Sequence, residues 1–133
     1  MKITLKSTDN LDHYTATNEA GHSIALSADG SATGPMEAVL MAVAGCSTVD
    51  IVMILKKMRQ DVTNVEVEVD GTRREEIPRV YTGIHLHYKI YGEAKDKKVE
   101  QAVALSLEKY CSVSLMLGKA VTISSSWEVL SAD

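Results

Sequence analysis

The segment from Met36 to Leu55 carries almost no charged or hydroxyl side chains, and this feature most limits how the chain can fold. Pro35 suits a first helical position, so the segment predicts a helix from about Pro35 to Met58. The charged and hydroxyl residues in the apolar segment are Glu37, Ser47, Thr48 and Asp50. A helix that is apolar nearly all round must be buried on every side.

Two environments can bury such a helix. A membrane span requires about 20 apolar residues, whereas Asp50 lies inside the segment and the charge-free run 38–49 is shorter than that. The alternative is that surrounding protein buries the helix. The helix would be about 35 Å long, against a radius of gyration of about 14 Å for a subunit of this size, so one chain can hardly enclose it. We therefore expect a homodimer in which a second copy, related by a twofold axis, covers the helix.

The other segments of the 133-residue chain predict one α+β domain over residues 1–133. Alternating runs at 2–8, 11–17 and 22–27 predict an N-terminal antiparallel ribbon. Strict alternation at Val65–Asp70 predicts a strand with one acidic face, paired in a long hairpin with about Val80–Tyr91. Helical spacing follows at 95–110, then a short helix to about Lys119 and a closing strand at Val121–Leu130. Antiparallel sheets should surround the long helix.

Charge and the two cysteines restrict the functional class. A net charge of −4 gives no electrostatic footprint for nucleic acid or for an anionic membrane, so neither is expected as a partner. The start of the chain lacks an apolar core of signal-peptide length, which predicts a cytoplasmic protein. Two cysteines far apart in the sequence form no disulfide framework. In a reducing compartment they are either buried small hydrophobes or working thiols.

Both cysteines stand at positions that allow either interpretation. Gly45 precedes Cys46 inside the apolar helix, where a glycine costs about 1 kcal/mol against alanine. It permits either access to the thiol or close packing of helices. Cys111 lies at the junction of two helices, where Ser112 or Ser114 can cap the second helix and its N-terminus can stabilise a thiolate.

Other chemistries have weaker support. His85 and His87 share one face of a strand, but the chain has no Cys-x-x-Cys or His-Glu-x-x-His spacing, so we expect no metal and no cofactor. No local signature of a cysteine protease surrounds Cys46 or Cys111.

Two motifs resemble the reactive-cysteine motifs of the OsmC/Ohr family of organic hydroperoxide resistance proteins. Residues 34–47, GPMEAVLMAVAGCS, resemble the helix that carries the first cysteine of that family, and residues 108–114, EKYCSVS, resemble the second motif. The order of elements from residue 1 to 130 is similar as well, and the chain is closest to the short OsmC-like branch.

The resemblance implies an intertwined homodimer with two central helices between sheets and active sites at the interface. It also implies a mechanism in which Cys46 attacks an apolar hydroperoxide and becomes a sulfenic acid, Cys111 condenses with it to a disulfide, and a dithiol reduces the pair. Glu37 matches a family glutamate that orients a catalytic arginine. About 13 Å of rise and two and a half turns separate Glu37 from Cys46, so the two face opposite sides of one helix. If Glu37 serves a site with Cys46, it must be the Cys46 of the other chain.

The chain departs from the family pattern in two places. The family's catalytic arginine comes from the N-terminal strands, but the first arginine here is Arg59. The cations available in those strands are Lys2, Lys6, His13 and His22, and no spacing selects one of them. In addition, Asp50 follows Cys46 by one helical turn, and a nearby carboxylate disfavours a thiolate.

These observations predict a thiol peroxidase of weak activity that acts on organic hydroperoxides through Cys46 and Cys111. The alternative from another class is a non-enzymatic dimer of the same fold, which binds an apolar small molecule or senses oxidants through the same thiols.

Overall fold

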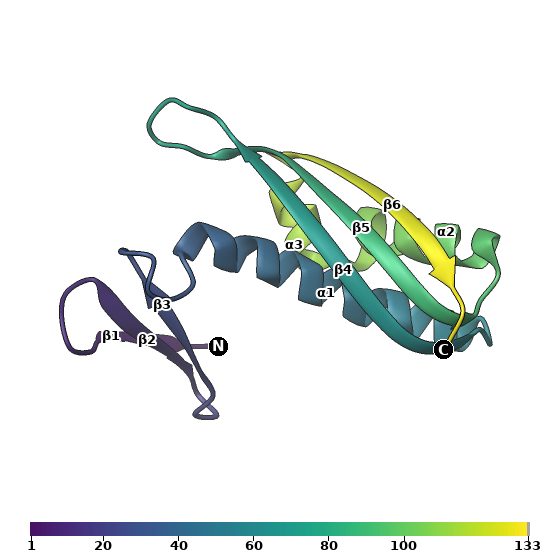
Figure 1. Ribbon diagram of the computed structural model, residues 1–133, viewed down its shortest axis with the longest axis horizontal. Coiled ribbons are helices and arrows are strands. Elements are labelled where there is room, and N and C mark those ends of the chain that lie inside the picture. Colours follow the sequence, from purple (N-terminus) through teal and green to yellow (C-terminus); the bar gives the residue numbers. More distant parts are fainter. Residues whose placement is uncertain (133) are drawn as a thin grey trace. The chain divides into compact units, whose positions relative to one another are not determined.

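A computed structural model describes residues 1–132, which form two compact units, Met1–Val39 and Leu40 onwards. Figure 1 labels the elements. Their bounds are β1 (Ile3–Ser7), β2 (His13–Asn18), β3 (Ser23–Ser27), α1 (Pro35–Lys57), β4 (Asp61–Arg73), β5 (Tyr81–Glu93), α2 (Asp96–Leu105), η1 (Ser106–Tyr110), α3 (Ser112–Leu117) and β6 (Thr122–Leu130). The predicted α+β order is confirmed.

The first unit contains the predicted N-terminal ribbon and the first turn of α1. Strands β1, β2 and β3 form an antiparallel sheet in sequence order. At the start of α1, the Glu37 carboxylate accepts a hydrogen bond of 2.8 Å from the backbone N–H of Gly34. This carboxylate therefore satisfies one of the donors that a helix N-terminus leaves unpaired.

The second unit is built on a three-stranded sheet in the order β4-β5-β6. The predicted hairpin is confirmed, because β4 and β5 pair antiparallel along almost their whole length. The sheet differs from the prediction in one detail: β6 runs parallel to β5, so the sheet is mixed. The chain between these strands forms the helices α2 and α3, and a crossover of that kind returns a strand in the parallel direction.

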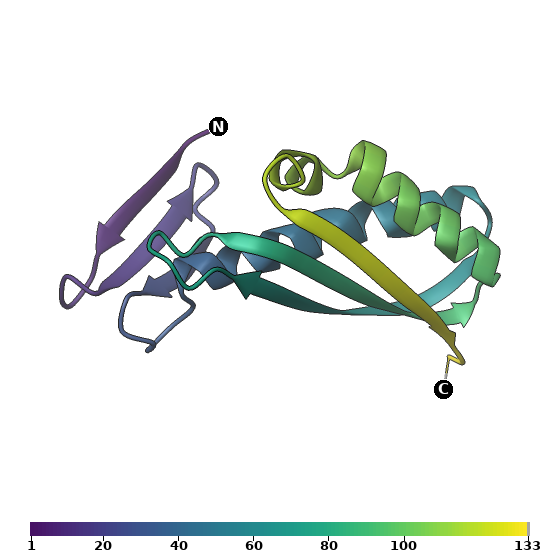
Figure 2. The same ribbon diagram turned by 90° about the horizontal axis from the view of Figure 1, so that it is seen from above.

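Helices cover one face of this sheet. In Figures 1 and 2, α2, α3 and the part of α1 that belongs to the second unit lie on the same side of β4, β5 and β6. Alternate residues of β5 are buried on that side, and they are Ile84, Leu86, Tyr88 and Ile90. This alternation follows from the period of two in a strand.

Helix α1 buries one stripe of its surface within a single chain. Its buried residues recur every fourth position, at Val43, Ser47, Ile51 and Leu55. An exposed apolar stripe also recurs every fourth position, at Met41, Gly45, Val49 and Met53. The expected burial on every side is therefore not supplied by one chain. By length and composition α1 also suffices to cross a membrane, a test that the core helix of a soluble protein passes equally.

The helical segment predicted at 95–110 changes its winding before Cys111. It is α-helical up to Leu105 and then forms the π-helical turn η1, which ends with a hydrogen bond of 2.7 Å from the Cys111 N–H to the Ser106 carbonyl. π turns of this kind are frequent at functional sites. The prediction that Ser112 or Ser114 caps the next helix was wrong, because Cys111 itself is the N-cap of α3.

Candidate thiol site

The second unit brings both cysteines and one carboxylate together. The Sγ atoms of Cys46 and Cys111 and a carboxylate oxygen of Asp50 all lie within 4.8 Å of one another. Cys46 and Asp50 are one turn apart on α1, so their side chains share a helix face. Cys111 reaches them from the junction between η1 and α3. The predicted cysteine pair therefore lies within one chain.

The two thiols differ in exposure. Cys46 is partly exposed, whereas Cys111 is fully buried. Burial raises the pKa of the Cys111 thiol, because a thiolate is poorly solvated in the interior. Hydrogen bonding from Ser114 opposes this rise, and its backbone N–H lies 3.4 Å from the Cys111 Sγ. Cys46 is therefore the thiol that a reagent can reach first.

Ser47 connects the helix that carries Cys46 to the rest of the unit. Its buried hydroxyl lies 2.6 Å from the phenolic oxygen of Tyr88 on β5 and donates to the Ala44 carbonyl at 3.2 Å. The Ser47 carbonyl accepts a hydrogen bond of 3.0 Å from the buried Ser106 hydroxyl at the start of η1. Ser47 thus fixes α1 against the sheet and against the segment that leads to Cys111.

Ser114 fixes the other side of Cys111. Its hydroxyl lies 2.8 Å from the Leu107 carbonyl and 3.2 Å from the Cys111 carbonyl, and it donates to these acceptors. Buried hydroxyls of this kind are stable only when their hydrogen bonds are made. The backbone around Cys111 is therefore held from both flanks.

Burial also affects Tyr88 on the neighbouring strand. It raises the pKa of the Tyr88 phenol to about 12; the hydrogen bond with Ser47 lowers the pKa, and the nearby Cys111 raises it. The phenol consequently remains protonated and available as a hydrogen-bond donor throughout the neutral range.

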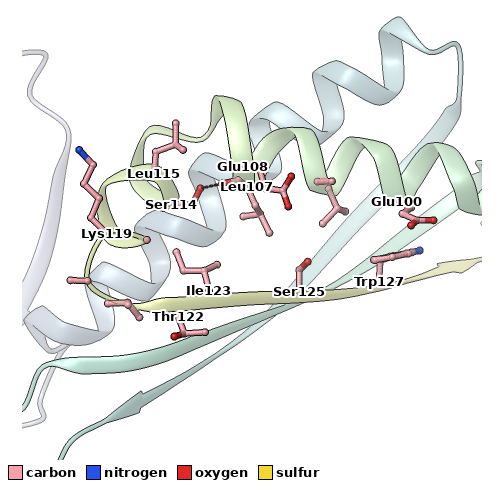
Figure 3. A pocket seen from close by; sticks show the side chains of 15 residues that line it. Glu100, Leu107, Glu108, Ser114, Leu115, Lys119, Thr122, Ile123, Ser125 and Trp127 are labelled. Carbon is pink, nitrogen blue, oxygen red and sulfur yellow. Dashed lines mark hydrogen bonds between the residues drawn. The ribbon is translucent and has the colours of Figure 1, made fainter.

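A largely apolar cavity of about 480 Å³ lies beside Asp50. Asp50 is part of its wall, which otherwise consists of Met53, Ile54, Lys57, Met58, Leu105 and Tyr110. A larger groove of about 790 Å³ lies elsewhere, between the helices α2 and α3 and the strand β6 (Figure 3). Neither cysteine is in the wall of these two cavities, but the smaller one is the better candidate for a reacting molecule, because it shares Asp50 with the thiol site.

Gly45 lies next to Cys46 on the exposed side of α1. A Cβ atom added at Gly45 would meet no other atom within 4 Å in the described chain. Close packing inside one subunit therefore does not explain this glycine. Access to the neighbouring thiol and close packing against a second chain both remain as reasons.

The residues predicted to support the thiols belong to the first unit. Glu37 is exposed there and caps α1 through Gly34. His13 is bracketed by two carboxylates, with Asp9 and Asp29 each 2.7 Å from its ring. The hydrogen bonds to Asp9 and then Asp29 raise the pKa of His13. This candidate cation is therefore already paired.

The predicted surface histidines form a separate polar ladder on the other face of β5. His85 contacts the hydroxyls of Ser124 and Ser126 at 2.7 and 2.9 Å. His87 contacts the Ser126 hydroxyl and the Glu128 carboxylate, both at 2.6 Å. Each ring nitrogen is thus engaged with β6.

Sequence reasoning missed the roles of Ser47, Tyr88 and Ser106 in holding the thiols, and it considered Ser114 only as a possible helix cap. One signal was available, because Tyr88 is the polar member of an otherwise aliphatic buried face at Ile84, Leu86 and Ile90. A buried phenol requires a hydrogen-bond partner, but the sequence does not show which hydroxyl supplies it.

A family model described as OsmC-like protein matches residues 28–126, a range that includes both cysteines and Asp50. The chain belongs to the OsmC family. Protein YhfA of Escherichia coli strain K12 is 49% identical to it over 122 residues, which are 90% of this chain and 91% of YhfA.

Solved structures of OsmC proteins share the fold. A hypothetical protein from Aquifex aeolicus is 34% identical, with a TM-score of 0.90 over 99% of this chain and 97% of that one. A Legionella pneumophila structure described as an organic hydroperoxide resistance protein OsmC is 18% identical, with a TM-score of 0.74 over 96% and 97% of the two chains. At that identity the likeness to the Legionella protein concerns the fold alone.

Tyr88→Phe should change the alkaline stability of the protein. The pKa of Tyr88 is raised from 10.0 to about 12 in the folded state. Its contribution to the free energy of unfolding is therefore complete below pH 10 and is lost as the pH rises towards 12. That loss is about 2–3 kcal/mol. At neutral pH the variant should be about 1 kcal/mol less stable than the wild type, because it lacks the hydrogen bond to Ser47. Above about pH 10 its free energy of unfolding should decline less than that of the wild type. Urea unfolding at a series of pH values measures both effects.

Tyr110→Phe, at an exposed position, is the control. If the free energy of unfolding of Tyr88→Phe fell with alkaline pH as steeply as that of the wild type, the raised pKa of Tyr88 would be contradicted.

Proposed function

We propose that this OsmC protein is a thiol peroxidase that reduces organic hydroperoxides through Cys46 and Cys111. The observation that carries the proposal is the pair of sulfur atoms within 4.8 Å in one chain, one partly exposed and one buried. This asymmetry suits a sequence of two steps. The accessible thiol meets the peroxide, and the buried thiol can react only with a partner that is already beside it.

The chemistry consumes one peroxide for each thiol pair. The Cys46 thiolate attacks a peroxide oxygen, the O–O bond breaks, and the alkoxide leaves and takes up a proton to become the alcohol. Cys46 is now a sulfenic acid. Cys111 attacks its sulfur, a disulfide forms and water leaves. An external dithiol then reduces the disulfide by thiol exchange and is itself oxidised.

The apolar cavity supports an organic substrate rather than hydrogen peroxide. Met53, Ile54 and Leu105 can cover an alkyl group, and each buried methylene contributes about 0.8 kcal/mol. Related structures support this substrate class, since the Legionella protein and OhrB of Bacillus subtilis are both described as organic hydroperoxide resistance proteins.

A second candidate function is a dimer that binds an apolar molecule or senses oxidants without turnover. This function is favoured by the positions of the arginines, which bind backbone carbonyls away from the thiols or lie outside the thiol cluster. Arg73, Arg74 and Arg79 donate hydrogen bonds to backbone carbonyls within the β4–β5 connection, and Arg59 follows α1. A guanidinium that stabilises the leaving alkoxide is worth about 10²–10³ in rate, so a site without one would turn over slowly.

Turnover with cumene hydroperoxide and dithiothreitol distinguishes the two functions. We expect the wild type to consume many equivalents of peroxide per chain, more slowly with hydrogen peroxide, and Cys46→Ser to consume none. Without dithiothreitol, which would itself reduce a sulfenic acid, Cys111→Ser should consume about one equivalent and retain a sulfenic acid that dimedone labels, because the resolving thiol is absent. Anaerobic stopped assays with mass spectrometry of the labelled peptide measure both quantities.

The neighbouring exposed Ser112 offers a matched control, and Ser112→Ala should turn over like the wild type. If the protein consumed only one equivalent of hydroperoxide per thiol pair in the presence of excess dithiol, the sensor function would be supported and the enzyme function rejected. Peptide mapping that finds only interchain bridges would contradict resolution by Cys111 of the same chain.

We propose further that the active form is a homodimer, covered along the exposed apolar stripe of α1. Met41, Val49 and Met53 are 59%, 61% and 51% exposed in the single chain. A contiguous apolar face of this kind marks an interaction surface. A second copy of the same helix, related by a twofold axis, presents the same residues in return. Such a dimer also permits the expected approach of Glu37 to the site of the other subunit.

Val49→Asp should therefore convert the dimer to a monomer or weaken it strongly, because it places a carboxylate in the covered stripe. Sedimentation equilibrium at micromolar concentration measures the mass. Gln101→Asp, which adds the same charge at an exposed position of α2, should leave the dimer intact. A wild-type monomer under these conditions would reject both the dimer and an interface site.

A further inference from the structure

We propose that Cys46, Asp50 and Cys111 bind a divalent metal ion, with Zn²⁺ preferred, when both thiols are reduced. This group of potential ligands was not expected from the sequence, because the second cysteine is far from the first and no ligand spacing marks the site. The fold creates it by placing the η1–α3 junction against one face of α1.

The donor atoms lie close to the geometry that zinc requires. They are within 4.8 Å of one another. Zinc bonds of about 2.3 Å to sulfur and about 2.0–2.2 Å to oxygen place tetrahedral ligand atoms roughly 3.5–4 Å apart. The three donor atoms must therefore move closer together when a metal ion binds. Cys46 and Asp50 are already on one helix face, and the backbone hydrogen bonds around Cys111 fix the third ligand.

The state of Asp50 is an independent observation in favour of a ligand. Its Oδ2 atom is buried, and no hydrogen bond to it is made within residues 1–132. A buried carboxylate oxygen without a partner is costly, by about 1–3 kcal/mol or more for a charged group. A cation held between this oxygen and two thiolates satisfies the carboxylate and neutralises the thiolates together.

The chemistry of the donor set selects the metal. Two thiolates favour Zn²⁺ over Mg²⁺ and Ca²⁺, which prefer oxygen ligands. Three protein ligands leave a fourth tetrahedral position, which water or a small molecule from the adjoining cavity can take. Because both sulfur atoms are ligands, the metal and the Cys46–Cys111 disulfide exclude each other. The ion would protect the thiols from oxidation, and peroxide chemistry would need the metal-free dithiol.

Metal titration of the reduced full-length protein tests this inference without any peroxide. Apo protein kept reduced with a phosphine is titrated anaerobically with Zn²⁺ against a chromogenic chelator, and with Co²⁺ for spectroscopy. We expect one ion per chain, visible Co²⁺ bands of tetrahedral type, and an ultraviolet sulfur-to-cobalt band that Cys46→Ser and Cys111→Ser each reduce by half. Asp50→Asn should keep that band and weaken Zn²⁺ binding by about a hundredfold.

Two controls define the site. Asp70→Asn, at an exposed carboxylate on β4, and the double variant His85→Ala/His87→Ala should bind Zn²⁺ like the wild type. Protein oxidised to the disulfide should bind none and recover on reduction. Unchanged affinity in Asp50→Asn, loss of binding in the histidine variant, or no binding by the wild type would each overturn the inference. Circular dichroism of each variant verifies the fold. Since the titration involves no hydroperoxide, its failure and a failure of the peroxidase proposal are separate results.

Discussion

The buried serine beside Cys46 organises the second unit of this protein. Ser47 holds α1 to the sheet through Tyr88 and to the η1 segment through Ser106, with both contacts removed from water. Each such hydrogen bond contributes only about 1 kcal/mol net, but an unmade one leaves a buried polar group at a cost of about 1–3 kcal/mol. The packing is therefore restricted to arrangements in which these groups meet, and those arrangements bring Cys111 to Cys46.

The chemical behaviour of the thiols follows from this arrangement. Burial of Cys111 raises the pKa of its thiol and shields it from solvent, while the partial exposure of Cys46 leaves it open to a reagent. Asp50 adds negative charge at the same place. The pair is consequently close enough to form a disulfide and has the donors for a metal ion. The proposed thiol chemistry and the proposed metal binding both depend on this geometry.

The sequence predicted those parts of the fold that local periodicity determines. Alternation in β4 and β5, and the apolar run of α1, located the hairpin and the long helix correctly, and the motif resemblance identified Cys46 and Cys111. The sequence did not predict contacts between segments that are distant along the chain. The parallel course of β6, the π turn before Cys111 and the meeting of Ser47 with Tyr88 depend on how a crossover returns to the sheet, which periodicity does not encode. Asp50 was expected as an unfavourable charge for Cys46, whereas its closeness to Cys111 came from the fold.

In the folded chain, the hydrogen bonds of Ser47 hold Cys46 and Cys111 together. The most direct measurement is the equilibrium between the dithiol and the intrachain disulfide in glutathione buffers, which gives the effective concentration of one thiol at the other. Wild type should form the intrachain disulfide in preference to glutathione adducts, and Ser106→Ala should lower the effective concentration by about fivefold to tenfold, as the loss of one buried hydrogen bond predicts. Separate glutathione adducts on Cys46 and Cys111 in the wild type, or an effective concentration that Ser106→Ala leaves unchanged, would contradict this role of Ser47.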